Sequence, residues 1–322
     1  MSARRVCALL LFRLLESPIA MPSSPLTERL LDADVLASIG RLDLVARTVV
    51  EGFLIGLHKS PYRGLSQEFA EHRPYIAGDE MRRIDWRVYA RTDRLYVKEF
   101  EEETNAAVRL LLDISGSLKF TPRKVSKLDY ARYLVASLAY LATKQNDRVG
   151  LVCFNDEVRE RLRTRGGERH LHTVLATLER IEAGGHTRIN HVLLAEAAQW
   201  KRRGLTILVS DLYDEGPEIV QAVSRVRRVG HDVIVMHLLD RAEKTLEQHG
   251  TYEFRDLETG QTLLADAQSV RRSYVERMES ERRYFRREFE LAGADYVELD
   301  TAEPLDRALA SYLRRRKARG KW

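Results

Sequence analysis

Acidic and hydroxyl side chains follow two apolar segments of this 322-residue chain. Asp113-Ile-Ser115-Gly-Ser117 comes directly after the apolar run Val108–Leu112, and Asp211 closes a second such run. Between them, the glycine-rich stretch that ends at Thr187 presents a further hydroxyl ahead of a helical pattern. Hard oxygen donors with few negative charges suit Mg²⁺, with Mn²⁺ as an alternative ion. The sequence therefore predicts a magnesium site formed by Asp113, Ser115, Ser117, Thr187 and Asp211.

The elements that would position these side chains alternate between short apolar runs and amphipathic helical patterns. Buried strands are expected at Val108–Asp113, Arg148–Phe154, Leu205–Asp211, Asp232–Leu239 and Tyr296–Leu299, with an edge strand at Val158–Arg163. Helices are expected over Lys127–Lys144, around 171–181 and 192–197, from Pro217 onwards and over 267–291, with a hairpin within 251–266. This alternation predicts an α/β fold with a doubly wound, mostly parallel sheet, whose ligands bind beyond the carboxyl ends of the strands.

The part of the chain before residue 107 has a different character. Apolar residues recur at helical intervals over 26–57, until Gly52 and Gly56 break the pattern. Residues 58–106 are dense in charged and aromatic side chains and are too polar for a central sheet. We therefore expect an N-terminal helical segment over 21–57 and a loop-rich subdomain with short strands over 58–106.

Asp-x-Ser-x-Ser, with a distant Thr and a distant Asp, resembles the metal-ion-dependent adhesion site of von Willebrand factor A domains. The resemblance implies a von Willebrand A-like, Rossmann-type fold over residues 107–312. It also implies that Ser115, Ser117 and Thr187 touch the metal, and that Asp113 and Asp211 act through waters or one of them directly. Such a site leaves one metal position for a carboxylate of a partner. The alternative is a degenerate site that keeps the loop but binds no metal.

A second resemblance lies upstream, in Tyr62–Phe69, Arg73-x-Tyr75-x-x-Gly78-Asp79, Arg82–Trp86 and Ala90-Arg91. These residues resemble the bacterial "domain of unknown function 58" family, and the likeness covers about residues 40–240. In that family the block precedes a von Willebrand A-like domain, and many members are encoded beside MoxR-type AAA+ ATPases. The one departure is Leu118, where many relatives of the metal site carry Met; this side chain is not a ligand.

The charged block itself has two interpretations. Opposite charges interleaved with aromatic rings can form a buried ion-pair network between the subdomain and the main domain, which fixes orientation more than it stabilises. A partner-docking surface is the alternative. The residues concerned are Asp79, Arg82, Arg83, Asp85, Trp86 and Arg91.

The net charge and the absence of enzyme motifs narrow the possible function classes. The net charge is +5, but the tail 313–322 contributes +6 and the first twenty residues +2, so the remaining chain carries −3. The chain contains no Gly-x-x-x-x-Gly-Lys phosphate loop, no His-Glu-x-x-His and no Gly-x-Ser-x-Gly. We therefore predict a non-enzymatic protein-interaction module that binds an acidic residue of a MoxR-type AAA+ ATPase or of its client. A Mg²⁺-dependent phosphate-ester hydrolase and polyanion or membrane-surface binding through the tail are the alternatives.

The ends of the chain and its two cysteines bear on localisation. Residues 1–20 have the outline of a leader, but Arg13 cuts the apolar run short, so we interpret Met21 as the start of translation. Cys7 and Cys153 are too few for a disulfide framework, and Cys153 lies in an apolar run. These features predict a cytoplasmic protein, with nucleic-acid binding and integral membrane association both disfavoured.

Overall fold

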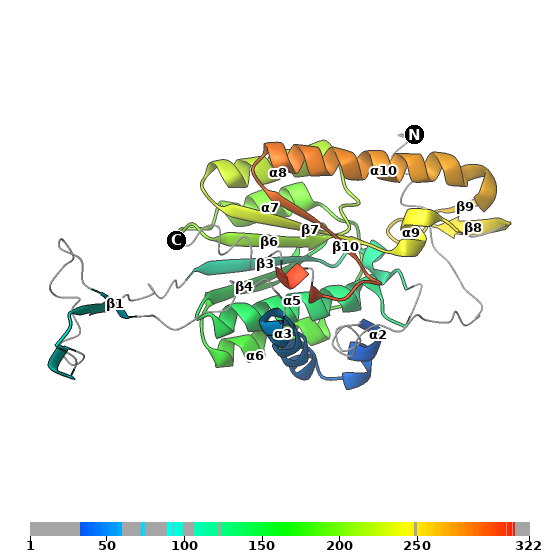
Figure 1. The fold of residues 1–322 in the computed structure, drawn as a ribbon. Helices are drawn as coiled ribbons and strands as arrows, with labels where there is room; N and C mark the ends of the chain where they lie inside the picture. The colour runs from blue at the N-terminus through cyan, green and yellow to red at the C-terminus, as the bar shows by residue number, and fades with distance from the viewer. Residues whose placement is uncertain are drawn as a thin grey trace.

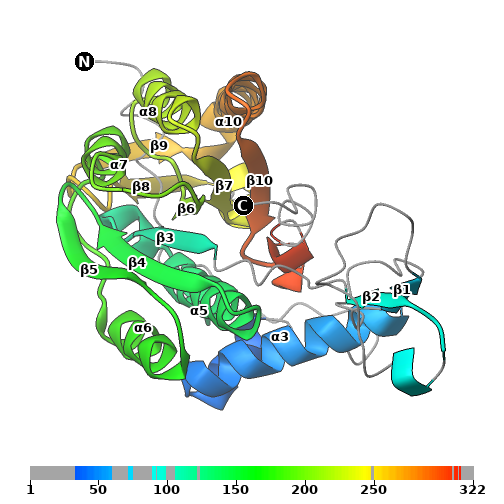
Figure 2. The same ribbon diagram turned by 90° about the vertical axis from the view of Figure 1, so that its left-hand side faces the viewer.

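The computed structural model describes residues 33–59, 72–74, 89–91, 93–98, 106–121, 124–247, 250–306, 308–310 and 312. Its centre is a six-stranded sheet with the order β10-β7-β6-β3-β4-β5 (Figures 1 and 2). Five strands run parallel, and β5 pairs antiparallel with β4 at one edge. The doubly wound, mostly parallel α/β fold predicted from the sequence is confirmed.

The strands of this sheet are β3 (Ala107–Asp113), β4 (Arg148–Phe154), β5 (Val158–Arg165), β6 (Leu205–Ser210), β7 (Asp232–Leu239) and β10 (Asp295–Asp300). A separate hairpin consists of β8 (Thr251–Arg255) and β9 (Thr262–Asp266). Each strand expected in 107–300, and the hairpin, is present at or within two residues of its predicted bounds.

The helices are α2 (Ala33–Leu36), α3 (Leu42–Lys59), α5 (Lys127–Lys144), α6 (Glu168–Arg180), α7 (Ile189–Ala197), α8 (Gly216–Arg228), α9 (Arg241–Thr245) and α10 (Ala267–Leu291), with 3₁₀ turns η2 (Ala37–Ile39) and η4 (Gly116–Lys119). The predicted bounds of α5 and α10 are confirmed. A capping box fixes the start of α5, because the Ser126 hydroxyl accepts from Asp129 N while the Asp129 carboxylate accepts from Ser126 N.

Two layers of helices cover the sheet. On one face, Leu110 and Leu112 of β3 pack in a core with α3, α5 and α6. On the other face, Leu111 packs in a core with α7, α8 and α10. Because successive side chains of a strand point to opposite faces, a strand buried on both faces is mostly apolar, as β3 is up to Asp113 apart from Arg109.

The prediction that Gly52 and Gly56 break the N-terminal helical pattern is wrong. Helix α3 continues through both glycines to Lys59. Glycine costs a helix about 1 kcal/mol relative to alanine. The buried stripe of α3, which includes Val49 and Phe53, packs in the core with α5 and outweighs that cost.

The charged segment forms a small two-stranded antiparallel sheet from β1 (His72–Pro74) and β2 (Tyr96–Lys98). It lies apart from the six-stranded sheet (Figures 1 and 2). Arg91 is exposed, and its place in an ion-pair network or a docking surface stays a prediction. Asp79, Arg82, Arg83, Asp85 and Trp86 lie outside the described residues, as do Cys7, residues 1–20 and the basic tail.

Two further predictions concern Cys153 and membrane-spanning segments. Cys153 is a free, fully buried cysteine, as its apolar run predicted. Within the described part of the chain, no helix is both long enough and apolar enough to cross a bilayer.

Candidate metal centre

The site lies where the parallel strands β3 and β6 end side by side. Leu112 of β3 is paired with Val209 of β6, so Asp113 and Ser210 follow at the same edge of the sheet. The chain continues from β3 to β4 on one side, whereas β6 and β7 lie on the other. This is the switch point of strand order at which α/β sheets bind ligands.

Asp113 organises this edge through its carboxylate. Oδ1 accepts from the backbone N–H of Ser115 at 2.9 Å, and Oδ2 accepts from Ser210 Oγ at 2.6 Å and from Thr187 Oγ1 at 3.1 Å. The side chain is fully buried. Burial, and then the charge of Asp211, raises the pKa of Asp113 to about 6. Asp113 therefore joins its own turn to the end of β6 and to the Thr187 loop. Its burial disfavours the ionised form of the carboxylate.

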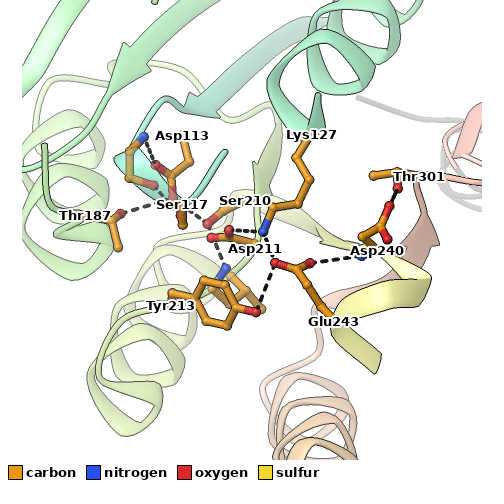
Figure 3. A network of polar contacts seen from close by, with 12 residues as sticks. Asp113, Ser117, Lys127, Thr187, Ser210, Asp211, Tyr213, Asp240, Glu243 and Thr301 are labelled. Carbon is orange, nitrogen blue, oxygen red and sulfur yellow. Dashed lines mark hydrogen bonds and ion pairs between the residues drawn. The ribbon is translucent and has the colours of Figure 1, made fainter. Parts of the chain in front are cut away.

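The two serines lie next to Asp113 on the turn that opens η4. Ser115 Oγ and Ser117 Oγ are 3.0 Å apart, and both side chains are buried. Figure 3 shows Ser117 beside Asp113, with Thr187 on the other side of the carboxylate. Three hydroxyl oxygens from two loops therefore gather at the carboxyl edge of the sheet.

Thr187 is positioned by backbone hydrogen bonds between its loop and the Asp113 loop. Gly184 N donates to Ile114 O, and Gly116 N donates to Gly185 O, each at 2.8 Å. Gly185 has a φ of +78°, and a Cβ there would lie 2.8 Å from Asn155 Nδ2. The glycines that precede Thr187 thus let this loop close on the end of β3.

Asp211 belongs to a buried ion-pair network (Figure 3). Lys127 Nζ, at the start of α5, lies 2.6 Å from Asp211 Oδ2 and 2.7 Å from Glu243 Oε1. Although burial disfavours the charged lysine, the charges of Asp211 and Glu243 raise the pKa of Lys127 above its ordinary value. Glu243 is held in place by the capping box of α9, in which its Oε2 accepts from Asp240 N at 3.1 Å.

His237 supports the backbone of the same residue. Its Nε2 lies 3.0 Å from the carbonyl oxygen of Asp211, and its Nδ1 lies 2.6 Å from the Tyr296 hydroxyl. Burial lowers the pKa of His237 to about 4, so the imidazole is neutral at pH 7 and adds no positive charge to the site.

The charge balance and the unpartnered atoms of the site fit a divalent cation. Asp211 Oδ1 is buried without a hydrogen-bond partner, although buried carboxylate oxygens ordinarily have one. Asp211 and Glu243 are buried on either side of the Lys127 ammonium group, and Asp113, also buried, lies close enough to Asp211 for the charge of Asp211 to raise its pKa. Among the described residues, no three His, Cys, Asp or Glu side chains converge as a metal site, so the donor set depends on the hydroxyls.

All five residues of the predicted magnesium site come together at this edge, and each is buried. That they bind a metal stays a prediction. Sequence reasoning missed Ser210, Lys127 and Glu243. Ser210 directly precedes Asp211, and this position could have indicated that its hydroxyl lies at the site. Lys127 and Glu243 gave no such indication, because they lie in helices, where a charged residue is ordinarily solvated.

We expect Mg²⁺ to raise the melting temperature more at about pH 8 than at about pH 5. The pKa of Asp113 is raised above its unfolded value, so the folded, metal-free chain binds more protons than the unfolded chain around pH 4 to 6. Its stability contribution is therefore lost as pH rises through about 6, where the carboxylate ionises. A bound cation favours that ionised form. Thermal melts with and without MgCl₂ at both pH values measure the difference.

His237 acts in the opposite sense, because its folded pKa lies below the unfolded one and its contribution is lost as pH falls from about 6.5 through about 4. The contribution of His237 is the same with and without Mg²⁺, so it cancels in the difference between the two melting temperatures at each pH. A Mg²⁺ effect of equal size at both pH values would contradict the prediction.

The fold and the site define an α/β protein with an acid-and-hydroxyl centre at the carboxyl edge of a parallel sheet. The family model described as "Protein of unknown function DUF58" matches residues 71–284, and the chain belongs to this family.

A curated relative is "Uncharacterized protein Rv1480" of Mycobacterium tuberculosis, which is 29% identical over 245 residues, covering 75% of this chain and 77% of the relative. Among solved structures, the chain is similar to the conserved hypothetical protein BatB of Bacteroides thetaiotaomicron, at 17% identity and a TM-score of 0.44, covering 66% of this chain and 98% of BatB. It is also similar to the SpRpn10 VWA domain, at 11% identity and a TM-score of 0.40, covering 65% of this chain and 95% of that domain.

Proposed function

We propose that this chain is a metal-dependent protein-interaction module that captures an acidic side chain of a partner protein. The observation that supports the proposal is the buried, unpartnered Asp211 Oδ1 beside three hydroxyls at one sheet edge. Ser115, Ser117 and Thr187 would hold the metal directly, and Asp113 and Asp211 through waters. A bound Mg²⁺ or Mn²⁺ would supply positive charge that hydroxyls and waters leave unneutralised, and a carboxylate is the ligand that such charge favours.

The chain's own residues favour binding over hydrolysis. The Ser115 hydroxyl lies against Ser117 Oγ and the Asp113 carboxylate. In the part of the chain that the structure describes, neither serine is hydrogen-bonded to a His or Lys that could remove its proton. A nucleophilic serine needs such an activating base. The site therefore supports capture of an anionic side chain better than turnover.

The partner we propose is a MoxR-type AAA+ ATPase or its protein client, with a role in protein assembly or maturation. This part of the proposal rests on the family, in which many members are encoded beside such ATPases.

A pull-down with a MoxR-type ATPase of the same organism tests the proposal. We expect the immobilised chain to retain the ATPase in Mg²⁺ and to release it in EDTA. Ser115→Ala is expected to abolish retention, whereas Ser273→Ala, on the exposed side of α10, leaves it unchanged. Retention that is indifferent to both EDTA and Ser115→Ala would overturn the proposal.

A further inference from the structure

The turn between β8 and β9 lies directly against the predicted metal loop. A Cβ added to Gly116 would be 2.6 Å from the carbonyl oxygen of Leu257 and 3.2 Å from that of Gly185. Backbone contact this close leaves no room for any side chain at position 116. The hairpin, more than 130 residues further along the chain, therefore forms part of the wall of the site.

Glu258, the next residue of this turn, carries its carboxylate into that contact. Its side chain is only 13% exposed, and Oε1 is buried without a hydrogen-bond partner. Oε2 lies 3.5 Å from Nδ1 of His186, the residue before Thr187. Burial, and then the charges of Asp211, Asp113 and Asp256, raises the pKa of Glu258 to about 8. A hydrogen bond from the Thr187 backbone partly offsets this shift.

The turn is built to hold Glu258 in that position. Asp256 Oδ1 accepts from the backbone N–H groups of Glu258 at 2.8 Å and Thr259 at 3.1 Å. Asp256 N donates to Gln261 O at 2.8 Å, which closes the turn. Phe254 of β8 anchors the hairpin in a separate core with Leu246, just after α9, and with residues of α10. Figure 1 shows the hairpin beside α9 and one end of α10. The placement of Glu258 is thus fixed by its own hairpin and needs no partner protein.

A carboxylate held among other buried carboxylates is unfavourable unless positive charge lies between them. The side chain of Asp211, fully buried, leaves Oδ1 unpartnered in the same site, so two carboxylate oxygens from different elements lack a donor. Lys127 does not meet this need, because its ammonium group pairs with Asp211 Oδ2 and Glu243 Oε1.

We propose that Glu258 is a metal ligand of this site and fills, from within the chain, the position that an acidic partner residue would take. This inference rests on the proposed function and adds a closed state of the metal site to it. In that state the chain satisfies its own metal, and an acidic partner binds only by displacing the turn between β8 and β9.

Two measurements on the full chain with Mn²⁺ test this role. Glu258→Ala is expected to weaken Mn²⁺ binding by about tenfold or more, as loss of groups that support a metal commonly does. At saturating Mn²⁺, the same variant is expected to show higher water-proton relaxation than the wild type, because water takes the vacated position. Glu253→Ala removes the same charge from an exposed position on the same hairpin and is expected to change neither value.

The outcomes separate this inference from the proposed function. Mn²⁺ binding by the wild type, with water relaxation unchanged in Glu258→Ala, would overturn the role of Glu258 and leave the metal site standing. A wild-type chain that binds no Mn²⁺ would overturn both. Weaker binding together with raised water relaxation, in Glu258→Ala but not in Glu253→Ala, supports Glu258 as the ligand.

Discussion

Replacing Lys127 by methionine is expected to lower the free energy of unfolding by about 3–5 kcal/mol, which is the typical cost of leaving a buried charge without its partner. The side chain is 1% exposed, and its ammonium lies within 2.7 Å of both Asp211 and Glu243. Methionine has a similar length, so the variant removes the charge with little change in packing. For a domain of this size we expect the melting temperature to fall by roughly 10 °C.

Two companion variants make this result specific. Lys144→Met lies at the other end of the same helix α5, is exposed, and is expected to cost less than about 0.5 kcal/mol. Adding Glu243→Gln to Lys127→Met removes one of the two unpaired carboxylates, so it is expected to recover part of the lost stability. A Lys127→Met chain as stable as Lys144→Met would show that the ion pairs do not hold α5 to this edge of the sheet.

Replacing both Ser115 and Ser117 by alanine is expected to reduce Mn²⁺ affinity by more than about 100-fold, since loss of supporting groups alone costs about 10–100-fold. The metal-free fold is expected to change little. The two hydroxyls bond each other, so removing both leaves neither unsatisfied, and the Asp113 carboxylate keeps its donors from Ser115 N, Thr187 and Ser210 when it loses the Ser115 hydroxyl. Binding is measured by titration and stability by thermal melting.

The choice of serines over Asp113 matters for this experiment. Asp113→Ala would leave three buried donors without an acceptor, on Ser115, Thr187 and Ser210, each at a cost of about 1–3 kcal/mol. Its effect on metal binding would then be mixed with loss of structure. Ser137→Ala, a fully buried serine in the middle of α5, is the control for losing a buried hydroxyl and is expected to leave Mn²⁺ affinity unchanged.

Much of the fold was predictable because local and tertiary signals agree. The apolar runs of β3 and β7 are buried throughout, so their bounds coincide with the hydrophobic pattern. Asp113 and Asp211 were predictable for the same reason, since each stands at the point where such a run ends. Thr187 was found through the glycines before it, which the structure uses to bring its loop onto β3.

The residues that sequence reasoning missed depend on contacts between distant segments. Lys127 is the first residue of an amphipathic helix, where a lysine is ordinarily solvated, and its pairing with the distant Asp211 and Glu243 accounts for its burial. Glu258 lies in a hairpin turn whose local sequence predicts a turn and nothing more. Its burial arises because the hairpin folds back onto Gly116. In the same way, the packing of α3 on α5 overrode the glycines that were expected to end the helix.

Titration of the full chain with Mn²⁺ by calorimetry tests the central claim most directly, that the carboxyl edge of β3 and β6 is a metal site. We predict that the wild-type chain binds one ion and that Ser115→Ala combined with Ser117→Ala weakens this binding by more than about 100-fold at an unchanged fold. A wild-type chain that binds no Mn²⁺, or a double variant that binds as tightly as the wild type, would contradict the account.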